Sequence, residues 1–174
     1  EECGAALAKA CAPAIVVGAG VARDGAWDAV IALAERHKAA VWVAPMSARC
    51  SFPEDHPLFA GFLTAGREAI VGALSAHDFV LALGGPMNLY HVEGAGPHMP
   101  EHAEVWLIGD NHVHAAWAPV GTAIVAKHSL KWLPLVGQLY WLTGRPSTSA
   151  TTAATPKTIR RRVIKMPAQS TRTR

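Results

Sequence analysis

The chain has 174 residues, of which 51% are hydrophobic, so it is long enough for one domain with a sizeable core. Its formal net charge of +3 combines two regions of opposite sign. Arg145–Arg174 holds eight of the sixteen basic residues and no acidic one, whereas Glu1–Thr143 has eight basic and thirteen acidic residues, a net charge of −5. No apolar run reaches the roughly 20 residues needed to span a bilayer, and the acidic start is unlike a signal peptide. A cytoplasmic protein that contacts no membrane is therefore expected.

Two further features of the composition narrow the classes of partner. Three cysteines without a CxxC pair disfavour a disulfide framework and a thiolate zinc site: Cys3, Cys11 and Cys50. The basic C-terminal segment could contact nucleic acid or an anionic surface. No aromatic residue follows Trp141, however, so the stacking surface of a single-strand binder is lacking and nucleic acid is not an expected partner. Residues 144–174 are predicted to form a basic, disordered tail.

The first half of the chain predicts alternating helices and strands. Residues 1–12 are expected to be the end of an upstream helix or a linker, and Pro13 then admits a strand over Ala14–Val17. A helix is predicted over about Ala26–His37, where apolar residues at spacings of three, one and three share a face: Trp27, Val30, Ile31 and Ala34. Val41–Ala44 is a second strand, followed by a long connection punctuated by prolines, Pro45–Gly66.

The second half continues the alternation. The expected elements are a helix over Arg67–Ala76, strands over Phe79–Leu83, Glu104–Ile108 and Ala123–Val125, a short helical turn over His112–Trp117, and a helix over Lys131–Leu142 with Ser129 as N-cap. Strands separated by helices imply right-handed crossovers and a mainly parallel sheet. The sequence therefore predicts a three-layer, Rossmann-like α/β domain over residues 13–143, with about five or six strands.

The loop after Phe79–Leu83 is the first candidate for function. The strand has no charge and ends at Gly84-Gly85-Pro86, which stops it and lets the backbone turn sharply. Ligands of such sheets bind beyond the carboxyl ends of the strands. The residues after the break carry His91, which is therefore a candidate site residue. On position alone, the alternative is a loop histidine that binds a carbonyl group or faces water.

A glycine-rich turn after the first strand suggests a second candidate, a nucleotide site. In Gly18-Ala19-Gly20, the backbone could approach a pyrophosphate. The third glycine of the G-x-G-x-x-G fingerprint is replaced by Arg23, and Val43-Ala44-Pro45 offers no acidic residue for a ribose. A simple strand-to-helix turn is the preferred interpretation, and a non-catalytic nucleotide- or flavin-binding module stays open as the alternative.

The histidines do not indicate a metal site. His98 and His102 are four residues apart, but Pro100 between them disfavours the helix that would place both on one face. His112 and His114 could face the same side of an extended segment, yet no carboxylate is clearly shared with them. No metal ligand is assigned.

Five segments, in this order and spacing, carry a family resemblance: AIVVGAGV, LAERHKAAVWVAP, ARCSFPEDHPLFAGFLTAG, DFVLALGGPMNLYH and APVGTAIVA. Together they resemble the central domain of thiamine-diphosphate-dependent decarboxylases, with the benzoylformate decarboxylases as the nearest group. The resemblance covers Pro13 to about Leu139. It implies a 2-oxo acid decarboxylase that uses thiamine diphosphate and Mg²⁺ as a full-length, homo-oligomeric enzyme.

The resemblance also implies what the chain lacks. In the family, a pyrimidine-binding domain supplies a glutamate, and a diphosphate-binding domain holds the metal through a GDG-to-NN motif. Gly109-Asp110-Asn111 lacks the second glycine and follows the wrong strand. The chain is therefore expected to be a fragment, with those two domains as its partners, and to be inactive and free of cofactor by itself. A structural remnant that binds nothing is a further alternative.

The resemblance gives one residue a role. The family places an active-site histidine in the Tyr-His step after this strand, here Tyr90-His91. An imidazole titrates near neutral pH, so His91 is expected to relay protons or to orient intermediates. Arg49 and Ser51 could contact a substrate carboxylate, and Phe59 could cover the core or a subunit contact, but none of them is assigned.

Overall fold

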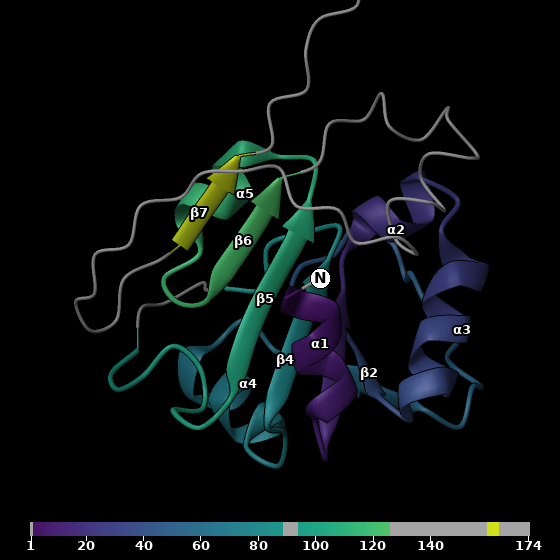
Figure 1. Cartoon of the computed structure of the whole chain (residues 1–174), viewed down its shortest axis with the longest axis horizontal. Helices are drawn as coiled ribbons and strands as arrows, with labels where there is room; N and C mark the ends of the chain where they lie inside the picture. The colour runs from purple at the N-terminus through teal and green to yellow at the C-terminus, as the bar shows by residue number, and fades with distance from the viewer. Residues whose placement is uncertain (1, 89–93, 126–159, 164–174) are drawn as a thin grey trace, which may run out of the picture.

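The computed structural model describes residues 2–88, 94–125 and 160–163. Its centre is one sheet in which every neighbouring pair of strands is parallel, in the order β3-β2-β1-β4-β5-β6-β7 (Figure 1). The strands are β1 Pro13–Val17, β2 Ala40–Val43, β3 Phe59–Phe62, β4 Phe79–Leu83, β5 Glu104–Gly109, β6 Thr122–Val125 and β7 Arg160–Val163. Parallel strands need crossovers, and the helices of the chain provide them.

Helices cover both faces of this sheet. They are α1 Glu2–Lys9, α2 Ala19–Arg23, α3 Trp27–His37, α4 Arg67–Leu74 and α5 His112–Trp117. In Figure 1, α1 lies in front of β4 and β5, whereas α4 and α5 lie behind the sheet. The predicted three-layer α/β fold with a mainly parallel sheet is confirmed.

Alternating side chains of the strands build two cores. Along β1, Ala14 and Val16 join the cluster that contains Ile70 and Leu74 of α4, whereas Ile15 belongs to the opposite cluster. That second cluster is completed from the helices by Leu7, Val21, Val30 and Ala34. All five residues of β1 are buried, which is why the strand reads as an unbroken apolar run in the sequence.

The strand order fixes where a ligand would be sought. The chain builds outward from β1 to β2 and β3, and then returns to the other side of β1 to place β4, β5 and β6. The order therefore reverses between β1 and β4, and such switch points open crevices at the carboxyl ends of the strands in α/β sheets.

Three elements differ from the predictions. β3 lies inside the predicted connection Pro45–Gly66, where Ala60 and Gly61 hide the alternation of an edge strand. The five-residue α2 follows Gly18 directly. β7 lies inside the predicted disordered tail and pairs with β6. Charged residues are common on edge strands, so the apolar pattern that predicts buried strands is missing from its run of arginines. Ser129 and the predicted helix Lys131–Leu142 lie outside the described residues.

No helix among the described residues is both long and apolar enough to cross a membrane.

Candidate functional site

The crevice between β1 and β4 is closed by contact of two glycine turns. The amide of Gly18 donates to the carbonyl of Leu83 at 2.8 Å, and the amide of Gly20 donates to the carbonyl of Gly84 at 2.8 Å. A Cβ atom placed on Gly18 would lie 2.7 Å from the Cα atom of Gly85, closer than real Cβ contacts. The glycines are therefore required by backbone packing between the ends of the two strands.

Other backbone groups of this turn are also bonded within the protein. The hydroxyl of Ser51, which is fully buried, donates to the carbonyl of Gly18 at 2.8 Å and accepts from the amide of Ala22 at 3.3 Å. The amide of Gly20, which a pyrophosphate would need, is bonded to Gly84. The geometry does not support the nucleotide- or flavin-binding alternative and favours the strand-to-helix turn.

Ser51 is thus a structural residue of this turn, although its side chain was considered for a substrate carboxylate. Arg49 is exposed and Phe59 is half-buried on β3. Phe62, at the end of the same strand, has 56% of its surface exposed. Arg49, Ser51 and Phe59 therefore stay unassigned.

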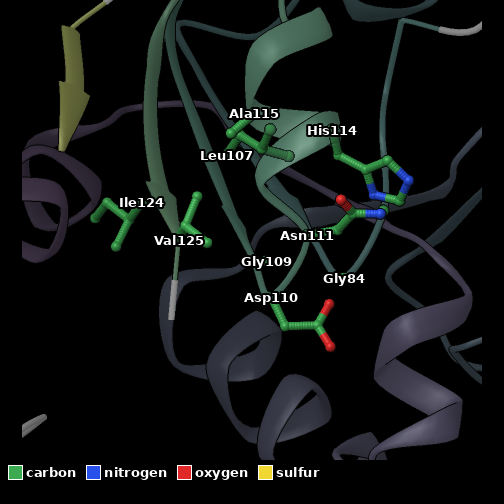
Figure 2. A pocket seen from close by; sticks show the side chains of 10 residues that line it. Gly84, Leu107, Gly109, Asp110, Asn111, His114, Ala115, Ile124 and Val125 are labelled. Atoms are coloured by element: carbon green, nitrogen blue, oxygen red, sulfur yellow. The ribbon is translucent and has the colours of Figure 1, made fainter. Parts of the chain in front are cut away.

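A small cavity lies beside the crevice, at the carboxyl ends of β4, β5 and β6 (Figure 2). Its polar lining comes from Asp110, Asn111 and His114, and it offers about 10 Å³ to a water-sized molecule. That volume corresponds to about one water molecule. The cavity is therefore far too small for an organic cofactor.

The polar side chains of Gly109-Asp110-Asn111 are held by protein contacts. A carboxylate oxygen of Asp110 accepts from the guanidinium of Arg23 at 2.6 Å, and the side-chain oxygen of Asn111 accepts from the amide of Val113 at 2.8 Å. Hydrogen bonds to Asp24 and Asp110 raise the pKa of Arg23 above its ordinary value. The side chains of this turn therefore do not fit a magnesium–diphosphate site.

The described histidines do not gather into a metal centre. Within residues 2–88, 94–125 and 160–163, no group of three or more histidine, cysteine or acidic residues could hold a metal ion. His98 contacts a guanidinium instead, with its Nε2 atom 3.0 Å from Nη2 of Arg67. The histidines do not contradict the assignment of no metal ligand.

His91 itself lies outside the described residues, but both chain segments that lead to it are described. We call them the outgoing arm, Gly84–Asn88, and the returning arm, Gly94–Met99. Met87 of the first and Met99 of the second are buried in the same core cluster. The side-chain amide of Asn88 donates to the carbonyl of His98 at 3.4 Å, so the two arms are joined at their base.

Sequence reasoning missed the two residues that hold the returning arm, Arg67 and Glu68. They begin α4, a helix that the sequence did predict to start at Arg67. Arg67 is buried and bonds to residues 29 and 31 positions away, and Glu68 bonds to one 27 positions away. A local sequence pattern cannot predict contacts between residues so far apart in the chain. The available hint was that Arg67 stands at the start of a helix rich in apolar residues.

Comparisons with known proteins agree with the fold. Residues 1–130 match the family model described as thiamine pyrophosphate enzyme, central domain. The chain is 33% identical over 156 residues to a benzoylformate decarboxylase of Pseudomonas aeruginosa, covering 90% of this chain and 29% of the relative. The chain thus spans less than a third of the length of that curated relative.

Two solved structures are similar to most of the chain. The thiamine diphosphate-dependent 4-hydroxybenzoylformate decarboxylase of Rhodococcus jostii RHA1 is 37% identical with a TM-score of 0.68, over 72% of this chain and 24% of its own. The benzoylformate decarboxylase of Polynucleobacter necessarius is 35% identical with a TM-score of 0.70, over 75% and 24%. Because the family model matches most of the residues, the chain belongs to the family of thiamine pyrophosphate enzyme central domains.

Proposed function

We propose that the chain is the central domain of a thiamine-diphosphate-dependent carboxy-lyase acting on benzoylformate-type 2-oxo acids, and that it contributes His91 to the active site. The observation that carries this proposal is the 33% identity to a benzoylformate decarboxylase over 90% of the chain. The strand β4 supports it, because it ends at Leu83 on the edge of the sheet where ligands of α/β proteins bind, and His91 follows eight residues later.

The cofactors of this proposal are thiamine diphosphate and Mg²⁺, held by parts of the full-length enzyme other than the described residues. Thiamine diphosphate, when bound, supplies the electron sink for loss of carbon dioxide. The described residues do not fit that group, since Asp110 and Asn111 are bonded within the protein and the crevice at Gly18 is closed. The pyrimidine- and diphosphate-binding domains are therefore the proposed partners, within a homo-oligomer, and the chain alone is proposed to be inactive.

The proposed role of His91 follows from the chemistry of its ring. A histidine has an ordinary pKa of about 6.5, so it can both donate and accept a proton near neutral pH. Decarboxylation of a 2-oxo acid to an aldehyde requires one proton to be delivered to carbon. Proton transfer by a positioned side chain contributes a factor of about 10² to 10⁴ in rate.

The test replaces His91→Ala in a full-length enzyme with the flanking domains restored, and follows decarboxylation of benzoylformate. We expect kcat to fall by about 10² to 10⁴. His112→Ala is the matched control, because His112 is an exposed histidine on α5, and it should keep the parent rate. Unchanged turnover in the His91→Ala enzyme would eliminate the proposed role.

The cytoplasmic location expected from the sequence is part of this proposal, and fractionation of cells that express the full-length protein would test it.

A further inference from the structure

We propose that Arg67 and Glu68 are positioning residues, which fix the base of the loop that carries His91 and so set the place of its imidazole. The inference rests on the proposed function of His91. The contacts from which it is argued join Arg67, Glu68 and the returning arm, Gly94–Met99, within the described residues.

Arg67 is the central anchor. Its side chain is buried, with 8% of the residue surface exposed, and its Nη1 atom donates to the carbonyl of Gly96 at 3.0 Å. Its Nη2 atom lies 3.0 Å from Nε2 of His98. Because a guanidinium can only donate, we assign His98 the neutral form with its proton on Nδ1. A buried charge is costly unless it is well bonded, so the contacts of Arg67 favour one conformation of the arm.

Glu68 holds the same arm from the next position. Its carboxylate accepts from the amide of Ala95 at 2.8 Å, and Gly94 packs so closely on that carboxylate that a Cβ atom would overlap it. Hydrogen bonds from the amide of Glu68 itself and from that of Ala95 lower the pKa of the carboxyl below its usual value. The carboxylate is therefore ionised near neutral pH, which suits an acceptor of backbone N–H groups.

The anchored arm is close to His91 along the chain. His91 is three residues from Asn88 and three from Gly94, and three residues span at most about 10 Å. Asn88 bonds to His98, and Met87 and Met99 share one core, so both arms are tied to the face of the sheet covered by α4. A displacement of about 1 Å in a catalytic group can cost about 10²-fold in rate. Loosening the base should therefore reach His91.

The first test measures the arm directly, by amide hydrogen exchange of the 174-residue chain. Arg67→Met and Glu68→Ala should each speed exchange over residues 94–99, most of all at Ala95 for Glu68→Ala, while β1 and β4 keep their protection. The matched controls are Arg36→Met and Asp28→Ala, an exposed arginine and an acidic residue in the first turn of α3. Unchanged exchange over 94–99 in folded variants would overturn the inference.

A second variant keeps the inference testable if Arg67→Met does not fold. Gly94→Ala leaves both anchors in place but adds a methyl group where the carboxylate of Glu68 lies. The flexible end of Glu68 can move aside, so the domain should stay folded while the bond to Ala95 is lost. Its exchange pattern should match that of Glu68→Ala, and a difference between the two would contradict the role given to Glu68.

The second test is a double-mutant cycle in the full-length enzyme. Glu68→Ala should lower kcat by about 10-fold to 100-fold, and the same change should have little effect when His91 is already alanine. Equal effects in both backgrounds would mean that Glu68 acts through stability alone, which would overturn this inference and leave the role of His91 intact. Normal turnover of His91→Ala would instead overturn the proposed function, and with it the positioning role.

Discussion

At the scale of single residues, glycine serves two opposite purposes in this domain. Gly20 sits against the backbone of Gly84, and no side chain fits between them. Gly72 lies within α4, and a Cβ atom placed on it would meet nothing within 4 Å. The first glycine is demanded by packing, whereas the second only weakens its helix through the extra freedom of the unfolded chain.

These two positions give a matched pair of stability predictions. Gly20→Ala should lower the free energy of unfolding by roughly 1–3 kcal/mol, because the methyl group must push two backbones apart. Gly72→Ala should raise it by about 0.5–1 kcal/mol. Urea unfolding of both variants of the chain measures the difference. Equal stability of Gly20→Ala and the parent would show that the two turns are not in contact.

At the scale of elements, the beginning of β4 is tied to the segment before β1 by one carboxylate. Asp78 accepts from the amide of Cys11 at 2.7 Å and from that of Ala12 at 3.0 Å. The hydrogen bond from Cys11 is the largest effect on the pKa of Asp78 and lowers it; burial opposes this, and the hydrogen bond from Ala12 adds to the lowering. The ionised side chain of Asp78 therefore holds the amino ends of the neighbouring strands β1 and β4 together.

These hydrogen bonds to Asp78 predict that the free energy of unfolding depends on pH. Because the pKa of Asp78 is lower in the folded chain than its ordinary value of about 3.9, its contribution is present above that value and is lost as the pH falls through the folded pKa. Asp78→Ala should cost about 1 kcal/mol near neutral pH, a figure kept small because the site is near solvent. Unfolding of parent and variant at falling pH should converge in acid. A difference in the free energy of unfolding that stays constant with pH would contradict the role of the ionised Asp78 side chain.

The elements also show what the sequence can and cannot predict. β1 and β4 were predicted because burial on both faces makes them continuous apolar runs, and α3 because its buried residues recur at helical spacing. β3 and β7 are edge strands, whose pairing depends on backbone groups of a neighbour more than on their own side chains. The roles of Arg67 and Glu68 were not predicted for a similar reason, because the partners of Arg67 lie far from it along the chain.

At the scale of the whole molecule, the domain has the strand order of a dinucleotide-binding fold, but the crevice between β1 and β4 is closed. The strand order reverses between β1 and β4, but Gly18 and Gly20 occupy the space at that point with bonds to Leu83 and Gly84. The chain spans 29% of the curated benzoylformate decarboxylase it matches. Because the described residues close that crevice, we predict that the chain binds no coenzyme by itself.

Thermal unfolding of the isolated chain with added flavin nucleotide, nicotinamide nucleotide, or thiamine diphosphate with Mg²⁺ tests this prediction most directly. A ligand at about 100 times its Kd would add about 2.7 kcal/mol to the free energy of unfolding and raise Tm by several degrees. We predict no shift with any of the three at about millimolar concentration. A saturable rise in Tm with one of them would contradict the closed crevice and show that the domain binds a coenzyme by itself.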